Sequence, residues 1–472
     1  MDIESLPKLT QASVPVQTHT FKIKDRLASG KALRDVAPLT AQKEWNPPAD
    51  RPDPVELLIE TGLGRMEELL PIRYGRMMVS PFTFYRGAAV VMASDLSHTP
   101  ATGLTLLADG DCHLLNFGGF ATAERNIIFD INDFDEVSFA PWEWDVKRLV
   151  ASFVIAGQSN GFDPADCREA GRLAARGYRQ RMAEYVELPT LQVWNDVVDL
   201  DTVIEKHVPD KQHRRFLRKR LAKASEQSAH EKEFAKLTYE AGDPPRIADQ
   251  PPLIFHYDSV QEEEFRQVAI DTLEEYKKNV NLGVNLLLDR FELVDIALKV
   301  VGVGSVGTVC GIILLMSGRG DPLFLQFKQA RRSVLEPYCG ASPYAHAGQR
   351  VVIGQRVLQA AGDIFLGWAT GTGERKIEFY LRQLSDAKIK PVIETMKPPN
   401  LKAYANLCGR VLARAHSRSG DPAVLTGYMG KSAAFEDALA DFGVAYAEQN
   451  KMDHVRLLEA IRSGRIQANQ AE

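Results

Sequence analysis

The segment that most restricts the fold is "LVDIALKVVGVGSVGTVCGIILLMSGRGDPLFLQFKQA", residues 293–330. Two β-rich runs flank a glycine loop, and a Gly-Asp-Pro turn leads into a third run, which predicts an antiparallel meander. Gly302, Gly304 and Gly307 have GxGxxG spacing. The next residues, "TVCGIILLM", favour a strand, whereas a dinucleotide-binding βαβ unit needs a helix here. The segment therefore predicts a strand–turn–strand flap.

A glycine flap can place backbone N–H groups over nucleotide phosphates, as the Gly-rich loop of protein kinases does. That geometry predicts a lysine in the next strand, and Lys328 stands there. Strand alternation puts Phe324, Gln326 and Lys328 on one face, so the ammonium can point under the loop toward the α- and β-phosphates. The alternative is a glycine-rich hairpin with a surface lysine. The candidate nucleotide-binding residues are Gly302, Gly304, Ser305, Gly307 and Lys328.

Polar groups also gather in "LLADGDCHLLNFGGF", residues 106–120. Asp111 and Asn116 are five positions apart, the spacing of the kinase catalytic loop, where Asp accepts a hydroxyl proton and Asn binds a metal. A hairpin after Asn116 would return the chain so that Asp133, in "NDFDE", lies beside it. Because Mg²⁺ needs only one or two side-chain oxygens besides phosphates and waters, Asn116 and Asp133 are the candidate metal ligands.

Neighbouring polar residues are candidates for supporting roles. His113 is a candidate catalytic group that would orient Asp111 by a hydrogen bond, with a structural histidine as the alternative. Asp145, in "PWEWDVKRL", would brace the catalytic loop from the following helix. Single acids nearby are better interpreted as turn formers or caps. These are Asp109, Asp130 and Asp135.

Arginines recur in "RYGRMMVSPFTFYRGAA". Arg73, Arg76 and Arg86 are candidates to hold transferred phosphate or an acidic acceptor, although pairing at helix ends and on the surface fits them equally well. The basic run in residues 211–223 is expected to form a solvated helix face balanced by acids. Those acids are Glu226, Glu231 and Glu233.

Composition excludes several classes of protein. The net charge of −5 among 57 basic and 62 acidic residues is too small to indicate a nucleic-acid or anionic-membrane partner. The five cysteines form no C-x-x-C pair, so neither a disulfide framework nor a zinc site is indicated. No window approaches the roughly 20 apolar residues of a membrane helix. A cytoplasmic protein is expected.

Together the segments resemble the protein-kinase-like fold. "GDCHLLN" with "NDFDE" and "PWEWD" is most similar to aminoglycoside phosphotransferases, whose catalytic loop has a Gly-Asp-x-His-x-x-Asn form. Here the catalytic and metal loops precede the glycine loop, so the resemblance implies a circular permutant, which keeps its contacts when the old termini are close. It implies a hinge strand at "KIEFYLRQL" and a helix leading into the catalytic loop at "AYANLCGRVLARAHSRSG".

The resemblance also implies a glutamate partner for Lys328. Glu336 is the candidate and is placed with the nucleotide-binding residues, although it follows the lysine closely. The helix expected at 346–361 offers Gln349 and Gln355 instead. Departures from the kinase pattern include Asp109 in place of His and Gln326 in place of a small residue.

The whole chain also resembles an uncharacterised bacterial family, domain of unknown function 2252, which implies no activity. The similarity lies in "RYGRMMVSPFTFYRGAA", "GDCHLLNFG", "NDFDE" and "QRVVIGQRVLQAAGDIFLGW".

These observations predict an α+β, two-lobed, kinase-like fold in permuted order. A flexible arm at 1–50 precedes a helical lobe at 51–255, whose last residues, 241–254, form a proline-rich linker. A mostly antiparallel β lobe at 256–390 carries the glycine loop, and helices in 391–472 return to the helical lobe.

The expected function is ATP- and Mg²⁺-dependent transfer of the γ-phosphate to a hydroxyl of an unidentified small molecule or protein. Asp111, Lys328 and His113 form the expected catalytic centre. Nucleotidyl transfer on the same fold and a nucleotide-binding scaffold without chemistry remain alternatives.

Overall fold

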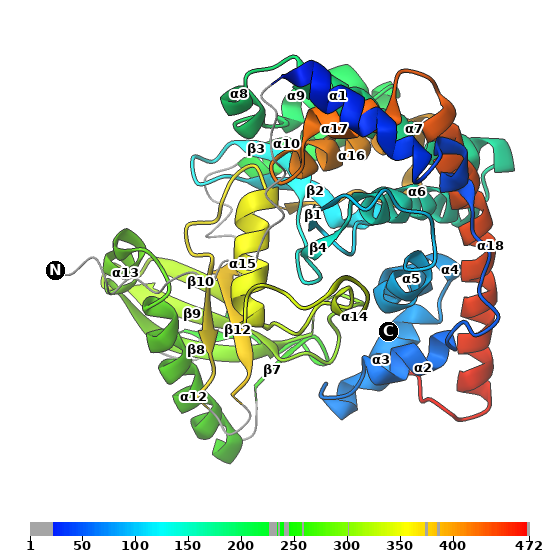
Figure 1. Ribbon diagram of the computed structural model, residues 1–472. Helices are drawn as coiled ribbons and strands as arrows, with labels where there is room; N and C mark the ends of the chain where they lie inside the picture. The colour runs from blue at the N-terminus through cyan, green and yellow to red at the C-terminus, as the bar shows by residue number, and fades with distance from the viewer. Residues whose placement is uncertain are drawn as a thin grey trace.

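A computed structural model shows a mixed α+β protein with antiparallel sheets, which confirms the expected class. Figure 1 shows a β-rich region on one side and a larger helical region on the other. The structure describes residues 22–225, 234, 237–239, 245–256, 259–300, 302–372, 376–384 and 388–469.

The β-rich region is built on a six-stranded antiparallel sheet with strand order β11-β12-β10-β9-β8-β7. The central β8-β9-β10 meander confirms the prediction from sequence. Two helices, α12 and α13, cover one face, and α15 packs on β11 and β12. The bounds are β7 (Ile254–Phe255), β8 (Phe291–Lys299), β9 (Cys310–Ser317), β10 (Pro322–Gln329), β11 (Gly367–Thr370), β12 (Glu378–Gln383), α12 (Ser259–Lys277), α13 (Leu282–Leu288), α14 (Glu336–Cys339) and α15 (Ala347–Leu358).

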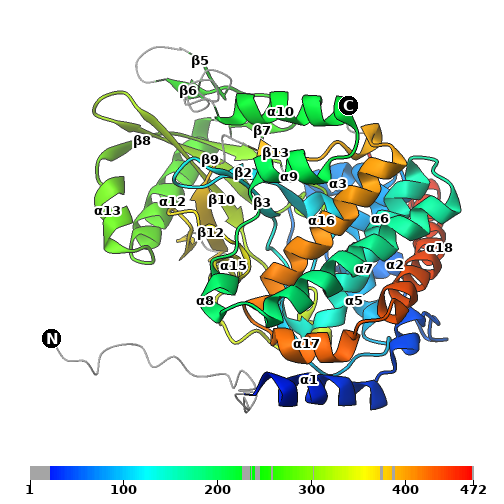
Figure 2. The same ribbon diagram turned by 90° about the horizontal axis from the view of Figure 1, so that it is seen from above.

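The helical region surrounds α6 (Trp142–Ser159), which is buried along most of its length because α7, α16 and α18 pack against it. Helices from the end of the chain therefore share a core with helices from its middle, as Figure 2 shows. The other bounds are α1 (Ile23–Ala32), α2 (Pro54–Glu60), α3 (Leu70–Met77), α4 (Pro81–Gly87), α5 (Ala89–Leu96), α7 (Pro164–Val186), α8 (Thr190–Trp194), α9 (Leu200–His207), α10 (Lys211–Ser225), α16 (Pro398–Ser417), α17 (Pro422–Met429) and α18 (Ala434–Arg462).

Short strands in the helical region position the polar loops. β1 (Thr105–Ala108) pairs with β4 (Ser138–Pro141), and the hairpin of β2 (Phe117–Ala121) and β3 (Ile127–Ile131) lies between them in sequence. This pairing returns the chain after β3 to the loop after β1, as the sequence predicts. The remaining short elements are β5 (Thr238–Tyr239), β6 (Arg246–Ile247), β13 (Lys388–Ile389), and the 3-10 helices η2 (Leu33–Asp35), η3 (Leu39–Lys43), η4 (Glu67–Leu69), η5 (Leu114–Asn116) and η6 (Ile393–Thr395).

The expectation of a flexible arm at residues 1–50 is wrong for residues 22–50. Helix α1 packs on α17 so closely that a Cβ on Gly30 would lie 1.9 Å from Val424 O. Arg34 Nε donates to Tyr428 O at 2.7 Å. Contacts made through glycine and backbone atoms produce no periodic pattern of apolar residues. The hydrophobic pattern of this segment therefore does not predict its packing. Residues 1–21 lie outside the described residues.

Two expected domain boundaries also shift. β7 belongs to the six-stranded sheet, so the β-rich region begins inside the expected linker. β13 pairs with β2, so the chain has rejoined the helical region by Lys388. Glu226, Glu231 and Glu233 lie outside the described residues.

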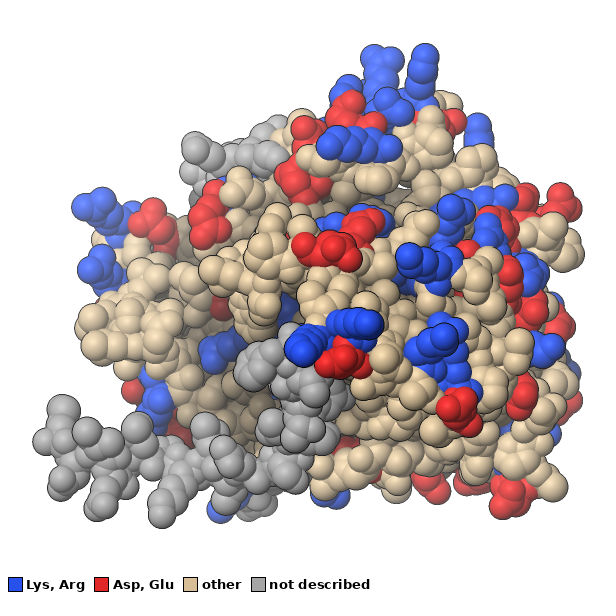
Figure 3. All heavy atoms as spheres, turned by 45° about the horizontal axis from the view of Figure 1, so that its top comes forward, with Lys and Arg blue, Asp and Glu red and all other residues tan. Residues whose placement is uncertain are grey.

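The surface in Figure 3 intersperses Lys and Arg with Asp and Glu, in keeping with the small net charge. Among the described residues, none of the helices has the length and apolar character needed to cross a bilayer.

Candidate functional site

A cleft of about 730 Å³, part of it open to solvent, lies between the β8–β9 loop and the loops that follow β1 and β3. Gly302, Gly304 and Ser305 line one wall, and Asp111, Asn116 and Asp133 line the other. Lys328 Nζ lies 3.8 Å from Asp133 Oδ1. The two remote segments that the sequence predicts to be opposed therefore face one cavity.

The glycine loop needs its glycines for backbone reasons. Gly302 and Gly307 have φ of 66° and 86°, a region that disfavours side chains. Arg65 Nη1 donates to the carbonyls of Gly304 (2.8 Å) and Val306 (2.7 Å). The N–H groups of Gly304 and Ser305 donate to none of the described residues. The loop thus keeps free donors of the kind that bind phosphate.

Lys328 is 4% exposed on β10, and its ammonium pairs with Asp135. Asp135 also accepts from Tyr380 Oη at 2.8 Å and from Ser305 Oγ at 3.0 Å. Burial opposes the charge of Asp135, but Lys328 and the two hydroxyl donors together lower the pKa of this carboxyl. Burial likewise opposes the charge of Lys328, yet Asp133 and Asp135 raise the pKa of the ammonium well above its usual value. Both groups are charged.

Asp135, interpreted from sequence as a turn former, is therefore the partner of Lys328. The structure does not bring Glu336 to the lysine, because its carboxylate meets Ser333 N at 3.3 Å and Arg332 Nε at 3.4 Å. Helix α15 contacts the acidic loop through Arg350, which donates to Asp135 O at 2.7 Å. The neighbouring Gln355 bonds to Gln359. Tyr380 was missed, although it stands opposite Lys328 in the β10–β12 register.

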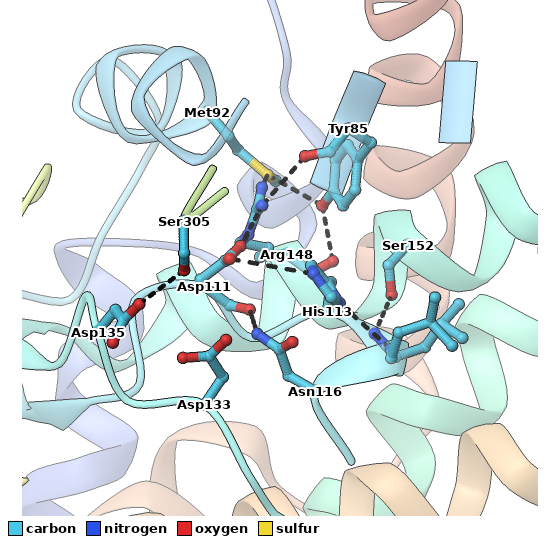
Figure 4. A network of polar contacts seen from close by, with 12 residues as sticks. Tyr85, Met92, Asp111, His113, Asn116, Asp133, Asp135, Arg148, Ser152 and Ser305 are labelled. Atoms are coloured by element: carbon cyan, nitrogen blue, oxygen red, sulfur yellow. Dashed lines mark hydrogen bonds and ion pairs between the residues drawn. The ribbon is translucent and has the colours of Figure 1, made fainter. Parts of the chain in front are cut away.

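Asp111 lies in the loop after β1 and is paired with Arg148 of α6 (Figure 4). Arg148 Nε donates to Asp111 Oδ1 at 2.8 Å, and Nη2 binds the same oxygen. Burial raises the pKa of Asp111 to about 7, Asp133 and Glu136 add to the rise, and Arg148 opposes it. The side chain of Asp111 is 20% exposed toward the cleft. This carboxyl can exchange a proton near neutral pH.

His113 does not orient Asp111 as expected. Its Nε2 lies 4.0 Å from Asp111 Oδ2, too far for a hydrogen bond. Its Nδ1 accepts from Leu115 N at 3.2 Å. Burial, with Arg86 and Arg148 nearby, lowers the pKa of His113 well below its usual value, so the ring is neutral. Arg148 holds the Asp111 carboxylate instead. It lies three residues after Asp145 on α6, a spacing that puts both side chains on one helix face and could have predicted this contact.

Asp145 holds the loop that follows β1 from helix α6, the position that the sequence predicts for it. Its carboxylate accepts from Asp109 N at 2.7 Å and Gly110 N at 2.9 Å. His416 Nε2 of α16 lies 3.0 Å from Asp145 Oδ2, and Tyr178 Oη lies 3.0 Å from His416 Nδ1. This buried chain ties the loop to α6, α7 and α16. The loop position is therefore set by the core.

The two candidate metal ligands both line the cleft, Asn116 as a buried side chain and Asp133 as a partly exposed one. Asn116 Nδ2 donates to Asp111 O at 2.7 Å, which leaves Oδ1 as the side-chain acceptor. The side chain of Asp133 is 44% exposed. One carboxylate and one amide oxygen suit Mg²⁺ when phosphates and waters supply the rest. Within the described ranges there is no cluster of three or more His, Cys, Asp and Glu suited to a metal.

The three candidate arginines have different environments in the structure. Arg73 is buried and donates to Leu58 O and Thr61 Oγ1, each at 3.1 Å, so it stabilises the α2–α3 segment instead. Arg76 donates to Gly302 O. Arg86 lines the cleft, and its Nε donates to none of the described residues. Two further arginines of the cleft were missed by sequence reasoning. They are Arg65 and Arg331.

Comparison with known proteins gives one match. The profile of a bacterial family described as "Uncharacterized protein conserved in bacteria (DUF2252)" matches residues 65–460 of the chain. No curated protein and no solved structure matches it.

Proposed function

We propose that this chain, which belongs to the bacterial DUF2252 family, is an ATP- and Mg²⁺-dependent phosphotransferase that acts on a hydroxyl acceptor. The observation that carries the proposal is the shared cleft. Its lining includes Asp135, the partner of the buried Lys328, and Gly304 and Ser305, whose N–H groups donate to none of the described residues. It also includes Asp111, the carboxyl whose pKa is raised to about 7. These are the parts that phosphoryl transfer requires, since the reaction depends mainly on positioning and charge stabilisation.

The residues present fit a magnesium nucleotide. Asn116 and Asp133 would hold the metal, and the N–H groups of Gly304 and Ser305 would bind phosphate oxygens. Bound Mg²⁺ would neutralise the negative charge of the phosphates. Lys328 adds a second fixed positive charge, which Asp135 keeps in place.

The roles of the chain's own side chains follow from their contacts. Asp111 accepts the proton of the acceptor hydroxyl, and Arg148 fixes the carboxylate in the orientation needed to receive it. Arg86, which lines the cleft beside Asp111, binds negative charge on the acceptor or on the transferred group.

The same contacts support a permuted kinase-like arrangement. The β-rich region supplies the loop, the lysine and helix α15, while the helical region supplies the catalytic and metal loops. In a kinase-like chain without the permutation, helices α16–α18 would precede the catalytic loop in the sequence. The packing of α16 on α6 and α7 is compatible with this order.

Thermal-shift titration with ATP and Mg²⁺, followed by product analysis, tests the proposal. We expect wild type to gain thermal stability from ATP with Mg²⁺, and Lys328→Met to lose that gain. Lys402→Met is the control, because it removes a surface lysine paired with Asp166 on a remote helix. Slow release of ADP, with water as acceptor, supports phosphoryl transfer, whereas release of AMP would favour nucleotidyl transfer. The absence of any ATP-dependent shift would refute the proposal.

A further inference from the structure

Arg86 is a cation of the cleft that forms no ion pair with any residue that the structure describes. It follows Tyr85, which lies beside the pair of Asp111 and Arg148 and accepts from Arg148 Nη2 at 3.2 Å (Figure 4). The Nη1 and Nη2 groups of Arg86 donate to none of the described residues and, unlike its Nε, are not closed off from solvent. Two donor groups of this side chain therefore remain available to a ligand.

The surroundings of Arg86 leave its positive charge without a close partner. Burial lowers the pKa of the guanidinium, and the charge of Arg76 lowers it further. Asp111, Glu394 and Asp133 act in the opposite direction from a distance. The guanidinium stays charged, because arginine is not deprotonated in proteins. A half-buried cation of this kind is unfavourable unless a ligand supplies negative charge.

Arg76 of α3 adds a second cation. Its Nη1 donates to Gly302 O, which holds the glycine loop but supplies no net charge. Among the residues placed by the structure, no carboxylate pairs with Arg76 either. Two guanidinium groups without counter-ions suit a ligand group that carries two negative charges. Phosphate is such a group, and arginine binds it well.

The position of Arg86 favours the acceptor over the nucleotide. The attraction of Asp111 acts on Arg86 more strongly than that of Asp133, which indicates that the guanidinium lies nearer the expected base than the expected metal ligand. In the proposed function, the loop N–H groups and Lys328 already bind the nucleotide phosphates. Arg86 is then left for the molecule that presents its hydroxyl to Asp111.

We propose that Arg86, supported by the charge of Arg76, binds a phosphate group of the acceptor, so that the acceptor is a phosphate monoester with a free hydroxyl. This class rests on the proposed function, because Asp111 is assigned there as the base. In the transfer, the bond from the γ-phosphorus of ATP to its bridging oxygen breaks, and ADP leaves with the electron pair. The acceptor oxygen bonds to that phosphorus, and Asp111 takes the hydroxyl proton. The phosphate on Arg86 does not react.

Isothermal titration of the nucleotide-free full chain with inorganic phosphate, at pH 8 and constant ionic strength, tests the binding. Wild type should bind phosphate saturably, and Arg86→Gln should bind it about tenfold more weakly or worse, the effect of losing hydrogen bonds to a charged group. Arg332→Gln is the matched control, because it removes the same charge from a side chain that is 85% exposed. Equal affinity of wild type and Arg86→Gln, or no saturable binding by wild type, overturns the proposal.

Lys328→Met separates this site from the nucleotide site. It removes the cation expected to hold the nucleotide phosphates, so the affinity for inorganic phosphate should change by less than about twofold. Binding that is lost in Lys328→Met and kept in Arg86→Gln would place the ion at the glycine loop and overturn the assignment. Circular dichroism checks that both variants are folded.

Sodium acetate distinguishes a doubly charged group from a single carboxylate. Wild type should bind acetate about tenfold more weakly than phosphate, because one negative charge leaves the second guanidinium unbalanced. Equal affinities for acetate and phosphate overturn the assignment to a phosphate monoester.

A nucleotide analogue tests whether the phosphate belongs to the acceptor. AMP-PNP with Mg²⁺ occupies the position of the transferred phosphate, so an acceptor site should keep its phosphate affinity within about threefold. Displacement of phosphate by the analogue would assign Arg86 to the transferred phosphate and overturn the acceptor class. If neither ATP nor the analogue binds while phosphate still binds through Arg86, the phosphotransferase fails and the acceptor assignment with it, whereas the phosphate site stands.

Discussion

Two carboxylates that line the same cleft each pair with a buried cation, yet the two acids differ. In the β-rich wall, Asp135 receives Lys328, Tyr380 and Ser305, and the pKa of its carboxyl is lowered. In the helical wall, Arg148 is the one described residue that donates to the Asp111 carboxylate, through two N–H groups at one oxygen, and the pKa of Asp111 rises to about 7. The number of donors decides which acid keeps its charge after burial.

The difference separates two functions. Asp135 is a fixed anion that holds Lys328 charged and in place. Asp111 can gain and lose a proton near neutral pH, as a general base requires. The proposed function therefore assigns structure and charge to Asp135, which has three donor residues, and proton transfer to Asp111, which has one donor residue. Changing the acids one at a time tests this division.

Asp111→Asn should have the largest effect. The amide keeps the shape and can still meet Arg148, but it cannot accept a proton, so kcat should fall about 10²- to 10⁴-fold. Arg148 is 2% exposed and loses the charge of Asp111, so the melting temperature should fall as well, and kcat is compared at a temperature where both proteins are folded. Steady-state phosphate release or transfer measures the effect. If Asp111→Asn turns over at the wild-type rate, Asp111 is not the base.

Asp135→Asn should mainly reduce stability. It leaves the ammonium of Lys328 buried beside only Asp133, at 3.8 Å, so we expect a loss of about 3 kcal/mol in the free energy of unfolding. Urea titration measures this loss. Asp133→Asn is the matched control and should cost less than about 1 kcal/mol, because its side chain is 44% exposed. Equal losses in the two variants would contradict the distinct role of Asp135.

The dependence of kcat/KM on pH should show a third, smaller effect. Because the pKa of Asp111 is raised to about 7, the active carboxylate forms above that pH, and kcat/KM should fall about tenfold per unit as pH drops below it. Arg148 lowers this pKa, so Arg148→Gln should move the acid limb to higher pH. Arg168→Gln, which removes a surface pair with Asp441, should leave the limb in place. A wild-type limb near pH 4 would contradict the raised pKa.

The sequence was sufficient to predict the features that depend on residues close to one another in the chain. The meander at 293–330 and the five-residue separation of Asp111 and Asn116 depend on turns and strand alternation, which a short segment determines. Asp135 resembled a turn former because its partners, Lys328 and Tyr380, come from strands far along the chain. Only the β10–β12 register brings those two together. Pairing of strands that are distant in sequence is a tertiary effect, and the spacing of residues within one segment does not predict it.

The residues around Asp111 also differ in whether the sequence could have predicted their roles. Arg148 lies on α6, three residues after Asp145, and the two side chains reach adjacent parts of one loop. Helical spacing could have suggested this pair. The neutrality of His113 could not be predicted, because it results from burial and from the nearby Arg86.

His113→Asn should have the smallest effect. His113 is neutral and does not bond to Asp111, and an Asn oxygen can still accept from Leu115 N, so kcat should stay within about threefold of wild type. The acid limb should not move, because a histidine whose pKa lies well below its usual value does not titrate there. The pH profile of kcat/KM measures both.

His113→Phe is the contrasting change, because it removes the acceptor and leaves Leu115 N unpaired at a buried turn. It should lower the free energy of unfolding by about 1–3 kcal/mol while the acid limb again stays in place. A shift of the limb in either variant would mean that His113 sets the protonation of Asp111. Asp111 would then depend on both Arg148 and His113. The number of hydrogen-bond donors alone would not explain the difference between the pKa of Asp111 and that of Asp135.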